Sequence, residues 1–108
     1  MIESTNPHSN LVDWKQGLSL KAEGNEFFKK QDFVSAISSY NSAIEILANT
    51  QESSSEVVTN LLGCYLNLSL IYLKQNNPYK AIEFANKGIK LNTKSAKAWY
   101  RRGEANLK

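Results

Sequence analysis

Five polar residues stand at positions where they could bind a carboxylate. They form two pairs four residues apart and one isolated amide, namely Lys21 with Asn25, Lys97 with Arg101, and Asn67. Residues four apart share one face of a helix, so each pair would project as a unit. Lysine and arginine give charge-assisted hydrogen bonds, and asparagine adds amide donors without like-charge repulsion. This combination of side chains favours a site for an acidic ligand.

Asn67 is the most informative of the five because it stands inside the apolar run CYLNLSLIYL. Burying an amide without a partner costs about 1–3 kcal/mol, so a ligand or a neighbouring side chain must supply one. A single lysine or asparagine on a helix is usually solvated surface, and we expect Lys94 and Arg102 to be of that kind. The argument for a site therefore rests on the set of five.

The cations are concentrated in the C-terminal part of the chain. The net charge is +3, but residues 1–60 hold four Lys or Arg against eight Asp or Glu, whereas residues 61–108 hold nine against two. The C-terminal part should therefore carry a positive field that attracts a negatively charged partner.

The composition predicts one small helical domain. The 108 residues are 42% hydrophobic and 21% charged, with only two prolines and five glycines. No apolar run approaches the roughly 20 residues of a membrane span, and the start MIESTNPHSN lacks a basic-then-apolar signal pattern. The single Cys64 forms neither a disulfide framework nor a metal cluster. We therefore expect a buried, reduced thiol in a cytoplasmic protein with no membrane partner.

An internal repeat is visible in the spacing of small and aromatic residues. Segments 22–48 and 67–93 match at an offset of 45, and a third copy begins 34 residues later, with Trp99 after Tyr65 and Gly103 after Ser69. Small residues let antiparallel helices approach closely, and an aromatic ring fills the space beside them. The matched pairs are Gly24 and Ser69, Phe27 and Tyr72, Ala36 and Ala81, Ala43 and Gly88, and Ile46 and Leu91.

The apolar periodicity predicts five helices, over about 14–30, 33–48, 56–75, 78–91 and 95–107. Asp32, Asn77 and Ser95 are the expected N-caps, and Pro78 suits a first helical position. The polar stretch NTQESSSEVV, where the first unit is 11 residues longer, is either a surface loop or a pair of helix extensions flanking one. We expect residues 1–13 to form a flexible segment.

A 34-residue period with small, aromatic and alanine positions, as in AWYRRGEA and YKAIEFANKGIKLN, resembles the tetratricopeptide repeat (TPR). The long first unit and CYLNLSLIYLK look like the TPR domains of FKBP-type and cyclophilin-type immunophilins, and small TPR co-chaperones with a similar insertion also fit. Thr93 stands where the family often has proline. The resemblance implies an all-α helix-turn-helix solenoid of about two and a half repeats, a right-handed superhelix with a concave groove. The domain would span 14–108, with repeat 1 over about 17–60 including its insertion, repeat 2 over about 62–94, and a partial repeat 3 from 95.

The resemblance also implies a function for the five polar residues. They match the carboxylate clamp, which grips the C-terminal Glu-Glu-Val-Asp of cytosolic heat-shock proteins 90 and 70. Lys21, Asn25 and Asn67 would hold the terminal Asp, including its main-chain carboxylate. Lys97 would reach the same carboxylates, and Arg101 would engage the acidic part of the peptide upstream.

Three further residues are implied as peptide contacts. Lys74 matches an additional contact position, and Leu70 and Leu73 would shape a pocket for the Val of the peptide. The resemblance implies a peptide-binding co-chaperone module, and any prolyl isomerase activity of an immunophilin parent would belong to another segment. The chain also stops inside the third repeat, so we expect apolar surface on its last helix and either a monomer or a dimer formed through that helix.

Other functions are weaker interpretations of the same residues. A TPR scaffold for another partner stays open. Nucleic-acid binding by the basic part has no motif in its favour, because the cations are paired with asparagines and the N-terminal half is acidic. We find no nucleophile–base set, no metal-ligand spacing and no phosphate loop, and His8 is isolated. We therefore expect no catalytic residue, metal site or cofactor in this part of the protein.

Overall fold

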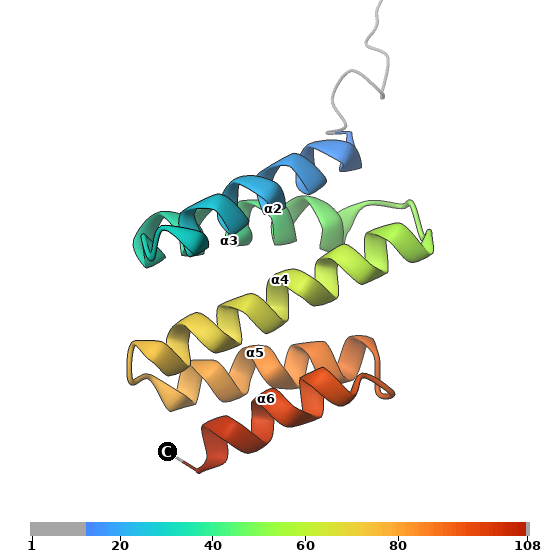
Figure 1. Ribbon diagram of the computed structural model, residues 1–108. Helices are drawn as coiled ribbons and strands as arrows, with labels where there is room; N and C mark the ends of the chain where they lie inside the picture. The colour runs from blue at the N-terminus through green and yellow to red at the C-terminus, as the bar shows by residue number, and fades with distance from the viewer. Residues whose placement is uncertain (1–12, 108) are drawn as a thin grey trace, which may run out of the picture.

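The described part of the chain is built from five helices without a strand (Figure 1). The computed structural model describes residues 13–107, so the expected flexible segment, His8 included, lies outside it except for Asp13. The helices are α2 (Trp14–Lys29), α3 (Phe33–Asn49), α4 (Ser55–Lys74), α5 (Pro78–Leu91) and α6 (Ala96–Asn106). Each bound lies within one residue of the predicted one, and the all-α class is confirmed for these residues.

The predicted helix starts are fixed by side-chain caps. Asp32, Asn77 and Ser95 each accept a 3.2 Å hydrogen bond from the backbone N–H three residues further on, which confirms all three as N-caps. Pro78 is the first residue of α5. The polar stretch after α3 contains a short connection over residues 50–54 that ends at Ser54, the N-cap of α4. The second alternative therefore holds, because residue 49 of α3 and residues 55–58 of α4 flank the loop.

The repeat extends to the turns between paired helices. Gln31, after α2, and Asn76, after α4, are 45 residues apart and both have a φ of 61°. The N–H of the next residue bonds back to the carbonyl of Phe27 in the first turn (2.9 Å) and of Tyr72 in the second (2.8 Å). This pattern is a helix C-terminal motif that reverses the chain within two residues. The two antiparallel pairs are therefore closed in the same way.

The small residues lie where helices approach most closely. A Cβ atom added to Gly24 of α2 would lie 2.7 Å from the ring of Tyr40 on α3. In the second unit Ser69 is buried and its hydroxyl donates a 2.7 Å hydrogen bond to the carbonyl of Ala81. Gly103, the matching residue of α6, has no heavy atom within 4 Å of the position of an added Cβ. The close approach is thus present in the first two units and open at α6.

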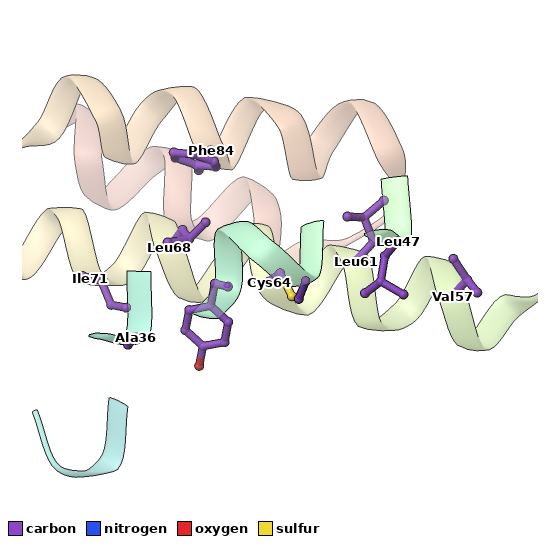
Figure 2. Packing of buried hydrophobic residues seen from close by; sticks show 10 residues of the cluster. Ala36, Leu47, Val57, Leu61, Cys64, Leu68, Ile71 and Phe84 are labelled. Carbon is purple, nitrogen blue, oxygen red and sulfur yellow. The ribbon is translucent and has the colours of Figure 1, made fainter. Parts of the chain in front are cut away.

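The central helix α4 contacts each of the other four described helices. Cys64, Leu68 and Ile71 on this helix are fully buried, and Figure 2 shows them packed with residues of α3 and α5. Cys64 is a free, buried thiol, as predicted. By length and composition α4 is also long and apolar enough to cross a membrane, contrary to the expectation that no apolar run approaches that length. Its contacts with the four other described helices explain this apolar character as that of a core helix.

The first helix of each unit contacts the first helix of the next, so α2, α4 and α6 form a continuous row, which we call the α2–α4–α6 face (Figure 1). Helices α3 and α5 pack as the second members of their pairs. Tyr100 on α6 is 62% exposed, and Leu107, the C-cap residue of that helix, is 88% exposed. The expectation of exposed apolar surface on the last helix is therefore confirmed.

We predict that Gly24→Ala destabilises the fold by about 1–3 kcal/mol, because the new methyl group would overlap the rigid ring of Tyr40. Gly103→Ala is the matched control, since it also replaces a helical glycine but meets open space. It should stabilise α6 by up to about 1 kcal/mol through helix propensity alone. Urea unfolding of both variants checks this, and equal stabilisation by the two would contradict the close packing of α2 on α3.

Candidate functional site

The five predicted site residues all lie on helices of the α2–α4–α6 face. Lys21 and Asn25 are on α2, Asn67 is on α4, and Lys97 and Arg101 are on α6. This follows from the repeat, since every one of them belongs to the first helix of its unit. The face therefore brings together residues that are up to 80 positions apart in the chain.

Three polar side chains meet between α2, α3 and α4. The hydroxyl group of Tyr40, on α3, donates to Oδ1 of Asn25. Nδ2 of Asn67 donates to Oη of Tyr40 (3.0 Å) and to Oδ1 of Asn25 (3.3 Å). We call these residues the Asn25–Tyr40–Asn67 network. It supplies the partner that the Asn67 amide requires, and that partner is a set of neighbouring side chains.

Tyr40 is the buried member of this network. Its side chain is inaccessible to solvent and lies against Gly24. Burial raises the pKa of the Tyr40 hydroxyl to about 12, although the hydrogen bond from Asn67 lowers it in part. The hydroxyl is therefore neutral at physiological pH and acts as donor and acceptor at once.

Lys21 is held by α4 rather than by its own helix. Its Nζ donates a 3.0 Å hydrogen bond to Oδ1 of Asn60, whose own amide group is fixed by a 2.8 Å bond to the carbonyl of Glu56. The end of the Lys21 side chain lies over Gly63, where an added Cβ would be 2.8 Å from Nζ. Gly63 thus leaves the space in which the ammonium group sits.

The two cations of α6 have different surroundings. The side chain of Arg101 is only 18% exposed, and its Nη1 bonds to Oε1 of Glu104 at 3.0 Å. Its Nε atom is buried without a hydrogen-bond partner among the described residues. Lys97 is exposed. Within residues 13–107 no hydrogen bond links either cation to the Asn25–Tyr40–Asn67 network. The structure therefore joins two of the five residues directly, Asn25 and Asn67, and places Lys21 on Asn60 and the other two cations on α6.

The remaining predicted contacts lie on α4. Leu70 and Leu73 are half-buried, and Lys74, the last residue of the helix, is exposed. These positions are compatible with peptide contacts, and their assignment stays a prediction.

One expectation about the charged residues is wrong. Arg102 is half-buried instead of solvated, because its guanidinium lies 4.5 Å from the centre of the Trp99 ring and its Nη1 donates to Oδ1 of Asn86 at 3.2 Å. The aromatic ring and the amide of α5 together hold it. Lys94 is exposed, as expected.

Sequence reasoning missed three residues of the site. Tyr40, Asn60 and Gly63 are not among the predicted site residues. A signal existed for the latter two, because Asn60, Gly63 and Asn67 recur at helical spacing on α4. No group of three or more His, Cys, Asp or Glu that could hold a metal is present among the described residues.

The sequence of this chain is similar to those of several known proteins. The sequence model of the tetratricopeptide repeat family matches residues 62–95. FK506-binding protein 59 of Drosophila melanogaster is 32% identical over 87 residues, which cover 81% of this chain and 20% of that protein. Sperm-associated antigen 1 of Homo sapiens is 34% identical over 86 residues, which cover 80% of this chain and 9% of that protein. The chain thus spans about a fifth or less of the length of these curated relatives.

A similar solved structure is the C-terminal TPR-containing domain of an FK506-binding protein of Plasmodium falciparum. It superimposes with a TM-score of 0.75 at 33% sequence identity, covering 87% of this chain and 66% of that one. This chain is therefore similar in both fold and sequence to a TPR-containing domain.

We predict that the fold loses stability at alkaline pH. Burial raises the pKa of Tyr40 from 10.0 and that of Cys64 from 9.0, each to about 12. The unfolded chain therefore releases these protons first, so the stabilisation is complete below pH 9 and is lost as the pH rises toward 12. Urea unfolding between about pH 8 and about pH 11 measures this.

The control for this prediction is the double variant Tyr40→Phe with Cys64→Ala, which removes both titrating groups. Its free energy of unfolding should be lower than that of the parent below pH 9 but should fall less steeply above it. A parent and a variant with the same slope would show that neither group is held neutral by burial.

Proposed function

The chain is a tetratricopeptide repeat domain resembling those of FK506-binding proteins, and from this premise we propose that it binds the acidic C-terminal peptide of heat-shock protein 90 or 70. Such a domain is a protein–protein interaction module. The five-residue clamp of Lys21, Asn25, Asn67, Lys97 and Arg101 would hold the peptide along the α2–α4–α6 face. The same proposal makes the protein a cytoplasmic co-chaperone.

The observation that carries the proposal is the arrangement of donors between α2 and α4. Asn25 and Asn67 are joined through Tyr40, and Lys21 is fixed beside them by Asn60. A peptide that ends in Asp presents two carboxylates within a few ångströms of each other. An ammonium group and two carboxamides supply the charge and the directed donors that such a pair requires.

The two cations of α6 support the proposal that the peptide extends from α2 across to α6. Arg101 keeps a buried Nε without a partner among the described residues, and Lys97 is exposed to an approaching ligand. Exposed charge pairs contribute under about 1 kcal/mol each, so the whole site would give an affinity on the order of micromolar, about −8 kcal/mol. Binding should weaken as salt is added.

We predict that Lys97→Ala, Arg101→Ala and Asn67→Ala each weaken the binding of a Glu-Glu-Val-Asp peptide at least several-fold. Each change removes a donor or a positive charge from the clamp, and the helices keep their apolar packing. Isothermal titration calorimetry gives the dissociation constants, and circular dichroism checks that the variants are folded.

Two controls accompany this series. Lys94→Ala removes an exposed cation that is not part of the clamp, so its affinity should stay close to that of the parent. The same peptide with an amidated C-terminus should bind much more weakly to the parent. Unchanged affinity in all three clamp variants would remove the assignment, and equal binding of the amidated peptide and of random oligonucleotides would indicate a general basic patch.

We also predict that Gly63→Ala weakens peptide binding several-fold without destabilising the domain. The new methyl group would lie only 2.8 Å from Nζ of Lys21 and would push the ammonium group away from Asn60. Alanine in place of a helical glycine raises helix stability by up to about 1 kcal/mol, so lost affinity could not be ascribed to unfolding. Gly103→Ala is the matched control, and a Gly63→Ala variant that binds like it would contradict the placement of Lys21.

A further inference from the structure

Tyr40 holds a position that the repeat does not reserve for a hydroxyl group. The residue 45 positions later, in the same place of the second unit, is Ala85, which is also buried. The packing of a helix pair therefore does not require the hydroxyl. In the first unit this hydroxyl makes two hydrogen bonds, both to predicted clamp residues on other helices.

The hydrogen bonds decide which way the Asn25 carboxamide faces. Its oxygen accepts from Tyr40 and from Asn67, so the oxygen is turned toward the interior. The two N–H groups on the other arm of the same carboxamide are then the ones left for a ligand. Lys21, the neighbouring cation, has an ammonium group that can only donate. The α2 side of the site therefore offers donors without an acceptor.

The second amide is held in a way that a ligand can alter. Nδ2 of Asn67 gives one N–H to Tyr40 at 3.0 Å and the other to Asn25 at 3.3 Å. A carboxylate arriving at Asn67 would take over the longer of these bonds, and the bond to Tyr40 would keep the amide in place. Asn25 would still be fixed by the hydroxyl.

We propose that Tyr40 is a positioning residue of the peptide site, whose hydroxyl keeps the Asn25 oxygen away from the ligand and thereby selects a free carboxylate over an amide. This inference rests on the proposed function. A free C-terminal carboxylate only accepts hydrogen bonds, so it matches a surface of donors. An amidated terminus carries an NH2 group, which would face those donors without an acceptor. Without the hydroxyl, only the 3.3 Å bond from Asn67 holds the Asn25 oxygen inward, so the carboxamide can turn over and present its oxygen to that NH2 group.

The test compares two peptides, Glu-Glu-Val-Asp with a free C-terminus and the same peptide amidated, on the parent and on Tyr40→Phe. The phenylalanine ring keeps the packing against Gly24 and removes only the hydroxyl. We expect the variant to bind the free acid several-fold more weakly and the amidated peptide as well as the parent does or better. The ratio of the two dissociation constants should therefore shrink. Tyr65→Phe, which removes the hydroxyl of a half-buried tyrosine on α4 outside the network, should leave the ratio unchanged.

The outcomes distinguish a failure of the proposed function from a failure of the role proposed for Tyr40. A parent that does not prefer the free acid would refute the proposed function and this inference with it. A parent that prefers the free acid, together with a Tyr40→Phe variant that keeps the same ratio, would overturn the inference alone. Equal weakening of both peptides would also overturn it, because the hydroxyl would then act only through stability.

A second measurement does not depend on any variant being folded. In the nuclear magnetic resonance spectrum of the parent, the side-chain N–H2 signals of Asn25 should shift when the free-acid peptide is added and should shift much less with the amidated peptide. Asn25 signals that move equally with both peptides, or with neither, would overturn the inference.

A double variant gives a further test. Adding Tyr40→Phe to Asn67→Ala should weaken free-acid binding by a smaller factor than adding Tyr40→Phe to the parent, since one of the two amides that Tyr40 positions is already gone.

Discussion

The hydrogen bonds among Asn25, Tyr40 and Asn67 reconcile two opposing demands on α4. This helix must be apolar to pack against four others, yet it also carries the polar amide of Asn67 toward α2 and α3. An unpartnered amide there would cost about 1–3 kcal/mol, which is a large share of the stability of a small domain. The network removes that cost before any ligand arrives and links three helices in doing so.

The same contacts show how a repeat becomes a specific site. Packing needs small residues, rings and alanines at fixed places, and those are shared between the units, as Ala36 and Ala81 are. The polar residues break the repeat, since Gly63 of the second unit stands where the third has Lys97, 34 residues later. Gly63 makes room for a cation from α2, and Lys97 supplies a cation of its own. The unit-to-unit differences therefore carry the chemistry, while the shared positions carry the fold.

Much of the fold was accessible from the sequence because it depends on local rules. Helix bounds followed from periodicity, and the N-caps Asp32, Asn77 and Ser95 followed from residue type. The site was accessible only in part. Which side chains face α2 from α3 depends on how two helices cross, so the sequence alone does not single out the hydroxyl of Tyr40. The contacts of Arg102 with Trp99 and Asn86 likewise form only in the folded chain.

The position of α6 has a consequence for the kinetics of local opening. This helix contacts only α4 and α5 among the described helices, and its Tyr100 and its C-cap residue Leu107 are exposed. Elements with few packed neighbours open first in native proteins, so amide protons of α6 should exchange with solvent sooner than those of α4. A ligand that spans the face from α2 to α6 would hold this helix closed while it is bound. Part of its binding free energy would then appear as slower exchange at the far end of the row, well away from the terminal carboxylate.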